Sequence, residues 1–337
     1  MLSRRRFLQT VGASLLSAPL AAEAQPAGKV FRIGMLRPGS PPDPYVDGFR
    51  RGLEELGYRE GTNVTLEIRW AAGRLERLDA LAAELASAKP DVIVAGAGAM
   101  GAQAVKKATR TIPIVMPGAA DPVSSGLVAS LERPGGNITG LALNASQLDT
   151  TRLRLLTEAL PRVSRVAVLW NPPNPVHGPV LRNVQAVARS LHLRLQPVEL
   201  WAPEHFHVVF TAMRRGYADA LLVLASPMFY LHLWQIADLA MKARLPAAAD
   251  FREFAEAGGL LSYGPSRLDL YRRAAVYVDK ILRGASPAEL PVEQPTEFEL
   301  VVNVRTATAL GLRLPEALLR RATYVIDAEG PGRPETP

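Results

Sequence analysis

The residues with the clearest chemical potential form the segment GAGAMG at positions 96–101. Gly96, Gly98 and Gly101 follow a short apolar run and open a helical pattern, as in the G-x-G-x-x-G turn of dinucleotide-binding proteins. Asp121 lies about twenty residues further on, where such a fold places its ribose-binding carboxylate. One interpretation is therefore an NAD(P)-dependent oxidoreductase. The alternative is a tight strand-to-helix turn, whose free backbone N–H groups can hold an anionic ligand group.

Four other segments place polar or aromatic residues where an apolar run ends: PGAADP (117–122), WNPPNP (170–175), ASPMF (225–229) and AADFREF (248–254). Open α/β sheets bind ligands at the carboxyl ends of their strands, so Asp121, Trp170, Asn171 and Asp250 are candidate ligand-binding residues. Each also has a structural interpretation. Asp121 and Asp250 are good helix N-caps, Trp170 suits a core, and Asn171 suits a turn.

Common catalytic motifs are missing from the sequence. HExxH, GxSxG, SxxK and a P-loop lysine do not occur. His205 and His207 stand two apart in an expected helix, so they point to different faces and make a poor metal pair. The sequence has no cysteine, which excludes disulfides, thiolate metal sites and cysteine nucleophiles. We therefore expect a protein that is not an enzyme and needs neither a metal nor a cofactor.

The N-terminus has the pattern of an export signal. Three arginines at positions 4–6 precede the uncharged, mostly small or apolar residues 10–22, and alanines flank Glu23. SRRRFL also resembles the twin-arginine consensus, although a Sec signal starts with arginines too. We expect cleavage after Ala24 and a soluble periplasmic protein. Loss of residues 1–24 lowers the formal net charge of +7 by two, and no basic run remains to favour nucleic acid.

The remaining chain alternates apolar runs with helical stripes. We expect strands at 30–36, 64–70, 91–96, 112–116 and 138–143, and then at 165–171, 193–200, 219–226, 245–250, 258–264 and 298–303. The strands at 112–116 and 138–143 are each expected to follow a helix, and a further helix is expected at 266–283. Apolar strands between amphipathic helices predict parallel sheets covered on both faces. The length favours two doubly wound α/β lobes, with a seam near residue 143.

Six stretches between about residues 30 and 327 carry a family resemblance: FRRGLEELGYREGTNVTLEIRWAAG, PDVIVAGAGA, TIPIVMPGAADPVSSGLVASLERPGGNITGL, RVAVLWNPPNP, FREFAEAGGLLSYGP and RRAAVYVDKILRGASPAELPVEQPTEFELVVN. Through these stretches the chain resembles the TrpX-like substrate-binding proteins of ABC transporters. This resemblance implies a type I periplasmic-binding-protein fold, with a ligand cleft between two Rossmann-like lobes and three crossovers. Lobe I would comprise 29–143 and 264–291, and lobe II 144–263 and 292–327, followed by a disordered tail at 328–337.

The resemblance also implies which loops line the cleft. Carried over position by position, the ligand-binding residues are Arg37, Ser40, Ala97, Gly98, Ala99, Met100, Ala120, Asp121, Trp170, Asn171, Ser226, Pro227, Met228 and Asp250. An amino-acid ligand would place its carboxylate on the N–H groups of Gly98 and Ala99, and its ammonium beside Asp121 or Asp250. Many relatives carry Thr or Ser where this chain has Ala97 to Met100, so its ligand can differ from theirs.

The function implied by this resemblance is capture of a small polar ligand. The protein would close around an amino acid or related compound by hinge motion and deliver it to a cognate ABC permease and ATPase. Export machinery and signal peptidase are further expected partners, nucleic acid is not, and the membrane is reached only through the permease. A ligand sensor for a signalling receptor and the exported oxidoreductase remain as alternatives.

Overall fold

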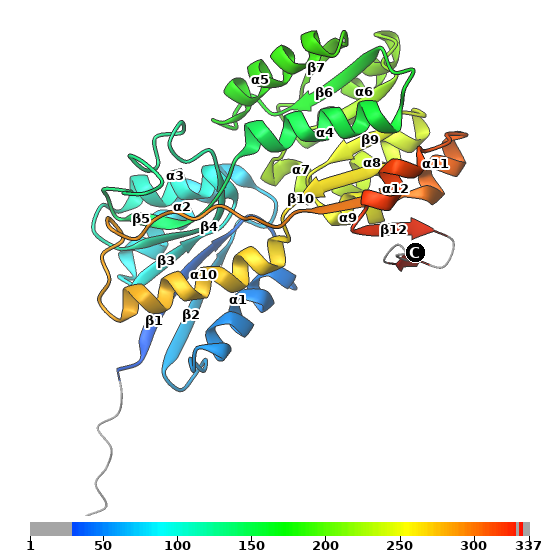
Figure 1. The fold of residues 1–337 in the computed structure, drawn as a ribbon. Helices are drawn as coiled ribbons and strands as arrows, with labels where there is room; N and C mark the ends of the chain where they lie inside the picture. The colour runs from blue at the N-terminus through cyan, green and yellow to red at the C-terminus, as the bar shows by residue number, and fades with distance from the viewer. Residues whose placement is uncertain (1–28, 328–329, 333–337) are drawn as a thin grey trace, which may run out of the picture. The chain divides into compact units, whose positions relative to one another are not determined.

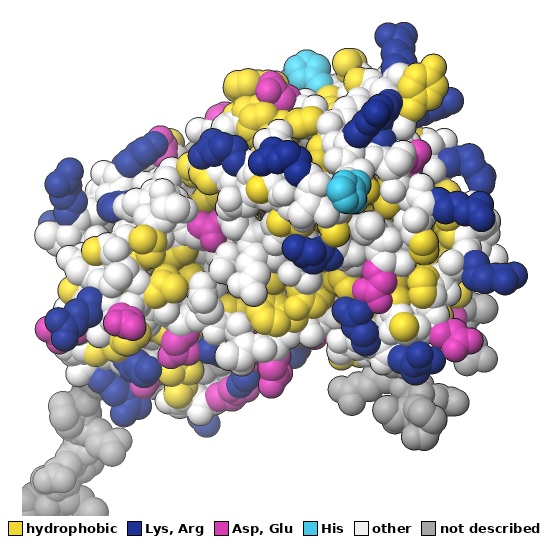
Figure 2. All heavy atoms as spheres, turned by 45° about the horizontal axis from the view of Figure 1, so that its top comes forward, with side chains coloured by type: hydrophobic (Ala, Val, Ile, Leu, Met, Phe, Trp, Pro, Cys, Tyr) yellow, Lys and Arg dark blue, Asp and Glu magenta, His cyan; other side chains and the backbone are white. Residues whose placement is uncertain are grey.

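The computed structural model describes residues 29–327 and 330–332, so the predicted signal segment at 1–24 lies outside it. The chain from Phe31 onward forms one unit that contains two separate β-sheets. No helix in the described ranges is long and apolar enough to cross a membrane. Lysines and arginines are spread among acidic side chains over the face seen in Figure 2, in keeping with the absence of a basic run.

The first sheet consists of five parallel strands in the order β2-β1-β3-β4-β5. Their bounds are β1 Phe31–Arg37, β2 Val64–Trp70, β3 Val92–Ala95, β4 Ile114–Ala120 and β5 Ile138–Leu143. Alternate residues of these strands enter two different cores. Met35 and Val94 pack with one buried cluster, and Leu36 and Ile93 with the other. This period of two buries both faces of the sheet, as a parallel arrangement requires.

Helices cover the two faces of this sheet in pairs (Figure 1). The helices are α1 Pro44–Glu55 with α10 Arg267–Leu282 on one face, and α2 Leu78–Ser87 with α3 Gly98–Ala108 on the other; the short helix η1 Leu75–Arg77 precedes α2. Asp43 starts α1 by accepting a hydrogen bond from the N–H of Tyr45 at 3.0 Å. Thus α10, although it follows the strands of the second sheet in sequence, completes the core of the first.

The helix that we expected before β5 is not formed. Residues 121–137 form turns and bends instead. Asp121, Gly126 and Gly135 have positive φ angles, and Pro134 interrupts the same segment, so a continuous helix cannot run there. The sequence prediction of a helix before 138–143 was therefore wrong.

The second sheet has the order β13-β12-β11-β10-β9-β8-β6-β7. Its strands are β6 Arg165–Trp170, β7 Arg194–Glu199, β8 Ala220–Val223, β9 Ala247–Ala249, β10 Leu261–Gly264, β11 Glu299–Asn303, β12 Tyr324–Asp327 and β13 Gly330–Gly332. β11 is antiparallel to β10, and β13 is antiparallel to β12. The last two strands were not expected. Residues 330–332 pair with β12, which corrects the prediction of a tail without structure from residue 328.

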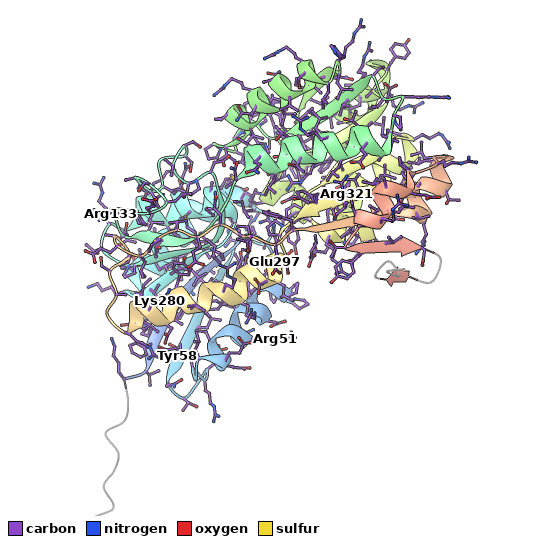
Figure 3. All side chains as sticks on the ribbon, viewed as in Figure 1. Arg51, Tyr58, Arg133, Lys280, Glu297 and Arg321 are labelled. Carbon is purple, nitrogen blue, oxygen red and sulfur yellow. The ribbon has the colours of Figure 1, made fainter. Side chains whose placement is uncertain are left out.

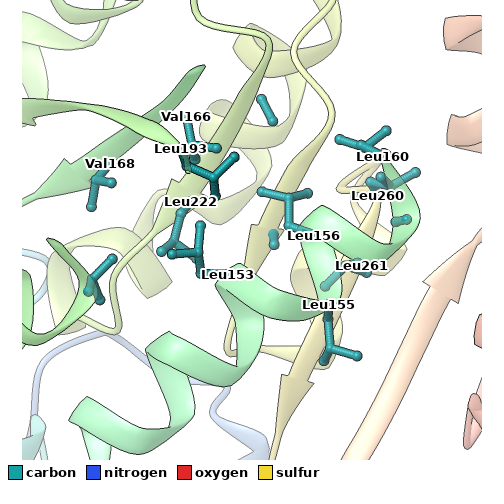
Figure 4. Close-up of a cluster of buried hydrophobic side chains, with 14 of the residues drawn as sticks. Leu153, Leu155, Leu156, Leu160, Val166, Val168, Leu193, Leu222, Leu260 and Leu261 are labelled. Atoms are coloured by element: carbon teal, nitrogen blue, oxygen red, sulfur yellow. The ribbon is translucent and has the colours of Figure 1, made fainter. Parts of the chain in front are cut away.

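Helix α4 (Ala145–Ala159) shows how the core of the second sheet is built. Asn144 caps its first turn by accepting from the N–H of Gln147. Leu153 and Leu156 then point at Val166, Val168 and Leu222 of the sheet, as Figure 4 shows. These leucines are fully buried, and each such burial contributes about 1.5–3 kcal/mol.

The other helices complete the two faces of this sheet. They are α5 His177–Ser190, α6 Phe206–Arg215, α7 Pro227–Leu231, α8 Leu233–Lys242, α9 Arg252–Glu256, α11 Val304–Leu310 and α12 Glu316–Arg321, with η2 Pro203–His205 before α6. A second buried cluster, which includes Phe206, Ile236 and Phe254, lies under α6, α8 and α9.

The chain passes between the sheets after β5, after β10 and after α10 (Figure 1). The last connection remains beside β5 as far as Glu293, whose carbonyl accepts from the N–H of Ala142 at 2.8 Å. Glu297, labelled in Figure 3, lies where this connection reaches the second sheet. The lobe limits given above stay a prediction, because these contacts describe connections and not boundaries.

Candidate ligand-binding site

A cavity lies where the carboxyl ends of strands from both sheets face each other. Residues at the ends of β1, β3, β4, β5, β8 and β9 line it, together with residues of α1, α4 and α10. The empty space among its lining atoms is about 700 Å³, including the part open to solvent. This is the position in which open α/β sheets hold small ligands.

Eight of the predicted ligand-binding residues line this cavity: Arg37, Ala97, Gly98, Ala99, Ala120, Ser226, Pro227 and Asp250. Six do not. Ser40 lines a separate surface pocket, and Met100, Asp121, Trp170, Asn171 and Met228 are not part of the cavity wall. The predicted residues that line the cavity thus come from several strand ends of both sheets, and their part in ligand binding stays a prediction.

The glycines of GAGAMG are required by backbone packing. A Cβ atom at Gly101 would stand 1.6 Å from the carbonyl oxygen of Gly96, and one at Gly96 would stand 2.4 Å from the carbonyl oxygen of Leu36. Ala97 and Gly98 both have left-handed backbone angles, with φ of 64° and 59°. The spacing thus makes a tight turn from β3 into α3, which was the structural alternative to dinucleotide binding.

This turn leaves the N-terminus of α3 uncovered. No side chain among the residues that the structure describes caps α3, and Gly98 and Ala99 at its start line the cavity. The first N–H groups of a helix have no partner within it, and the helix dipole favours negative charge there. The turn can therefore hold the carboxylate of a ligand.

Asp121 serves the start of another helix. Its carboxylate accepts from the N–H of Ala145 at 3.2 Å and from the Ser146 hydroxyl at 3.4 Å, at the first turn of α4. Burial raises the pKa of this carboxyl above its ordinary value. Both oxygens are engaged by α4, so Asp121 is not placed for a ribose or for a ligand ammonium. The expected helix directly after it is replaced by turns, and the helix it holds is the following one.

Trp170 and Asn171 belong to the second sheet's own architecture. Trp170 packs against the buried cluster under α4 and α5. The backbone N–H of Asn171 donates to Nδ1 of His177 at 2.8 Å, and its amide nitrogen donates to the carbonyl of Leu200 at 2.8 Å. Asn171 is fully buried by these contacts. The structural interpretation of both residues describes them better than a ligand-contacting one.

His177 fastens two strand-end loops, a role that the sequence did not reveal. Nδ1 accepts from Asn171, so Nε2 carries the proton and donates to the carbonyl of Ala225 at 2.9 Å. Burial lowers the pKa of His177 to about 4, so the ring is neutral near pH 7. Ala225 lines the cavity, and His177 therefore positions the cavity wall from behind.

Asp250 is the carboxylate in the wall of the cavity. The residue is 5% exposed, and its Oδ2 accepts from Nη2 of Arg267 at 2.5 Å. Its Oδ1 is buried without a hydrogen-bond partner among the described residues. Phe251, not Asp250, occupies the N-cap of α9, which removes the structural alternative. A buried carboxylate oxygen without a donor is costly, so a donor on the ligand would be favoured there.

The cavity also has an aromatic wall that the sequence analysis missed. Tyr45 and Tyr271 stack with ring centroids 5.3 Å apart, Tyr230 lies 5.5 Å from Tyr45, and Phe251 lies 4.9 Å from Tyr230. All four line the cavity. These residues come from α1, α7, the segment after β9, and α10. Because they are far apart in the sequence, no local spacing predicts that they form one wall. Such a wall favours an apolar or aromatic ligand part.

The arginines of the cavity are paired with protein groups. Arg37 donates to Asp43 and to the Tyr271 hydroxyl, and its guanidinium lies 4.6 Å from the Tyr271 ring centroid. Arg37 therefore holds Tyr271 in the aromatic wall, and its guanidinium is already paired with Asp43. In α4, Arg152 donates to Asp149 and to the carbonyl of Tyr263.

The buried pair in α4 carries an unusual carboxyl group. Arg152 and Asp149 are each 1% exposed. Burial raises the pKa of Asp149 to about 6, although Arg152 acts in the opposite direction.

No group of three His, Asp or Glu residues within the described ranges is placed to hold a metal ion.

Fold and cavity together define a bilobal solute-binding protein. The chain belongs to the ABC transporter substrate binding protein family, whose model matches residues 39–326. The match begins after β1 and ends within β12, and it covers every cavity segment from α1 onward. It bears out the resemblance to TrpX-like proteins and the type I periplasmic-binding-protein fold that the sequence predicted.

Individual relatives agree with this family. The chain is 26% identical over 266 residues to a tyrosine-binding protein of Clostridioides difficile, covering 79% of this chain and 76% of the relative. A conserved domain protein of Vibrio cholerae, 28% identical, superposes with a TM-score of 0.80 over 88% of this chain and all of that one. An ABC domain of Streptococcus pneumonia in complex with L-Trp, 24% identical, has the same fold with a TM-score of 0.80, over 87% of this chain and all of that one.

Proposed function

We propose that this chain is the solute-binding component of an ABC importer and that its cavity takes an α-amino acid with an aromatic side chain. The observation that supports this most is the buried Oδ1 of Asp250, which has no hydrogen-bond partner in the described part of the chain and lies at a cavity with an aromatic wall. A tyrosine-binding relative and the tryptophan complex of another support the same class of ligand.

Each part of such a ligand has a complementary group. The ammonium would donate to Oδ1 of Asp250, while Arg267 holds the other oxygen in place. The carboxylate would accept from the N–H groups of Gly98 and Ala99. The aromatic ring would pack against Tyr45, Tyr230 and their neighbours. The proposed contacts bind the zwitterion of an amino acid and include no reactive group. They therefore support a binding role over an enzymatic one.

Delivery requires that the protein opens and closes. Two contacts near the cavity join the helices of the first sheet to the second-sheet segment 250–256: Arg267 to Asp250, and the Tyr45 hydroxyl to Glu253 at 3.0 Å. A relative from Clostridium difficile is described as ligand-free and open. In our proposal the ligand favours closure, and the closed protein docks on a cognate permease with its ATPase.

The proposed place of action is the periplasm. The family is that of ABC transporter substrate-binding proteins, and the pattern at residues 1–24 fits an export signal of twin-arginine type, cleaved after Ala24. A fusion of residues 1–30 to a reporter, assayed in cell fractions with and without Arg4 and Arg5 replaced by Lys, would test the route. Cytoplasmic retention of the unaltered fusion would contradict it.

Calorimetric titration with L-tyrosine and L-tryptophan tests the ligand assignment. We expect binding to the unaltered protein, and a loss of at least about tenfold for Asp250→Asn, because a charge-assisted bond is replaced by a neutral one. Asp121→Asn is the matched control. It removes the same charge from a carboxylate outside the cavity and should change affinity less than about twofold.

Two outcomes would contradict the proposal. Equal losses of affinity for Asp250→Asn and Asp121→Asn would show that Asp250 does not hold the ligand. A thermal midpoint that rises with NAD(P)H, and with none of the amino acids, would restore the dinucleotide interpretation of GAGAMG. Circular dichroism of both variants verifies that each is folded before affinities are compared.

A further inference from the structure

Three guanidiniums line the cavity, and they differ in how many of their nitrogens the protein engages. Arg37 donates from all three of its nitrogens to other side chains. Arg267 holds Oδ2 of Asp250 in place. The remaining one, Arg152, is the largest side chain that is fully buried in the described part of the chain. Because arginine is almost never buried unless it is paired, the partners of its nitrogens indicate its role.

Two nitrogens of Arg152 bind the protein, and the third does not. Nε donates to the carbonyl of Tyr263 at 2.6 Å, and Nη1 donates to Asp149 at 2.5 Å. Nη2 has no hydrogen-bond partner among the described residues, and it is not one of the polar atoms there that are both buried and without a partner. Nη2 is therefore still accessible. Since Arg152 lines the cavity, the open space that Nη2 meets is the cavity.

Nη2 lies close to the segment that carries the proposed partner of the ligand's ammonium. A Cβ atom at Gly264 would stand 2.6 Å from the carbonyl oxygen of Asp250 and 3.6 Å from Nη2 of Arg152. Both residues line the cavity, yet their salt bridges are with Arg267 and Asp149 and not with each other. The cavity wall thus offers a positive donor and a negative acceptor that the protein leaves unpartnered. They match the two charged groups that an α-amino acid carries on one carbon atom.

The counter-ion of Arg152 loses its charge readily. Burial raises the pKa of Asp149 to about 6, and the negative charge of Asp250 adds to the rise, while Arg152 opposes it. Asp149 is therefore partly protonated at mildly acidic pH, and the guanidinium then has no carboxylate beside it. A buried charge without a counter-ion is costly, so an anionic group on the ligand is favoured at Arg152.

We propose that Nη2 of Arg152 donates to the carboxylate of the bound amino acid, and that this contact makes the protein select amino acids over the corresponding amines. The inference rests on the proposed function, in which the carboxylate also accepts from the N–H groups of Gly98 and Ala99. One carboxylate oxygen would then bind α3 on the first sheet, and the other would bind α4 on the second. A guanidinium suits this role because its N–H groups match a carboxylate in geometry as well as in charge.

L-Tyrosine and tyramine are the matched ligands, because tyramine lacks only the carboxylate. For Arg152→Lys we expect the affinity for L-tyrosine to fall at least about tenfold in calorimetric titration, since a charge-assisted hydrogen bond is lost. The affinity for tyramine, measured by displacement of L-tyrosine, should change less than about twofold. Lysine keeps a positive charge beside Asp149 and has a single nitrogen. Arg154→Lys, on an exposed residue of α4 outside the cavity, is the control and should change neither affinity.

A second variant allows for a folding defect in the first. Asp149→Asn combined with Arg152→Gln removes both charges of the buried pair, so that no unpaired charge is left inside the protein. It should show the same selective loss of affinity for L-tyrosine. Circular dichroism and thermal unfolding verify the fold of each variant before affinities are compared.

The results separate this inference from the proposed function. Equal losses for L-tyrosine and tyramine in Arg152→Lys, or an unchanged affinity for L-tyrosine, would overturn the inference alone. Asp250→Asn should weaken both ligands, because both carry the ammonium. If it weakens neither, while Arg152→Lys weakens L-tyrosine only, the role of Arg152 is supported and that of Asp250 is contradicted. Absence of binding of either ligand to the unaltered protein would contradict both the proposed function and the inference.

Discussion

At the scale of single residues, buried hydrogen bonds hold the loops of the cavity wall in place. His177 accepts from Asn171 and donates to the carbonyl of Ala225, so a neutral ring joins two loops. Protonation at Nδ1 would replace the acceptor by a second donor facing an N–H group. The ordinary pKa of histidine is 6.5 and that of His177 is about 4. The unfolded chain therefore binds a proton more readily than the folded protein.

This difference predicts a pH dependence that belongs to His177. Relative to His177→Gln, the unaltered protein should lose about 1 kcal/mol of unfolding free energy per pH unit as pH falls from 6.5 towards 4. Urea denaturation of both proteins at pH 7, 5.5 and 4.5 measures it. The comparison with the variant is needed because Asp149, whose raised pKa is about 6, changes stability in the opposite direction between about 6 and 3.8. Parallel curves for the two proteins would assign the histidine no such role.

At the scale of elements, the turn from β3 into α3 shows why a familiar motif can have a structural cause. Gly96 and Gly101 bring the helix against the strand end, and they leave the first N–H groups of α3 open to the cavity. A residue larger than glycine at either position would add a Cβ atom for which there is no space. The motif therefore specifies the close approach of two backbones.

The substitution Gly101→Ala tests this account. A Cβ at that position meets the carbonyl of Gly96 at 1.6 Å, so we expect a loss of at least about 3 kcal/mol in unfolding free energy or failure to fold. Gly136→Ala is the control, since a Cβ there has nothing within 4 Å and the residue has no positive φ. It should change stability by less than about 0.5 kcal/mol. Thermal unfolding of both variants distinguishes the two effects.

At the scale of the whole molecule, contacts at the cavity join two separately built cores. Tyr45 belongs to α1 on the first sheet, and Glu253 belongs to α9, which packs on β10 and β11 of the second. In the hinge motion that we propose, this hydrogen bond would break when the two sheets separate. It should therefore stabilise the proposed closed, ligand-holding form.

Removal of this one bond should speed ligand release. Tyr45→Phe keeps the stacked ring and loses the hydroxyl, so we expect dissociation of L-tyrosine to accelerate by about two- to tenfold. Tyr58→Phe is the control. Tyr58, labelled in Figure 3, donates to Asp279 of α10 beside the first sheet only, and its loss should leave the rate unchanged. Stopped-flow fluorescence measures both rates, and equal rates in all three proteins would contradict the role of Tyr45.

Much of the fold could be predicted from the sequence because its signals are local. Apolar runs such as VFRIGML and DVIVAG each match one strand to within a residue at either end, and leucines at helical spacing mark single helices. Periodicity alone therefore placed most of both sheets. The segment 121–137 and the strands β12 and β13 were missed. In the segment 121–137, prolines and glycines prevent the expected helix. The strands β12 and β13 form by pairing with β11 and β12, and no local pattern predicts that pairing.

The sequence by itself determined the alternation of strands and helices and the strand ends at which a ligand could bind, and it offered the tight glycine turn at α3 as one of two interpretations. Only the tertiary structure decided which groups face that ligand. Asp121 turned to α4, whereas Asp250 remained with a free oxygen, and Tyr45 and Tyr271 stacked across more than two hundred residues of chain. Strand order, lobe packing and side-chain pairing set these positions, and none of them is encoded in the spacing of neighbouring residues.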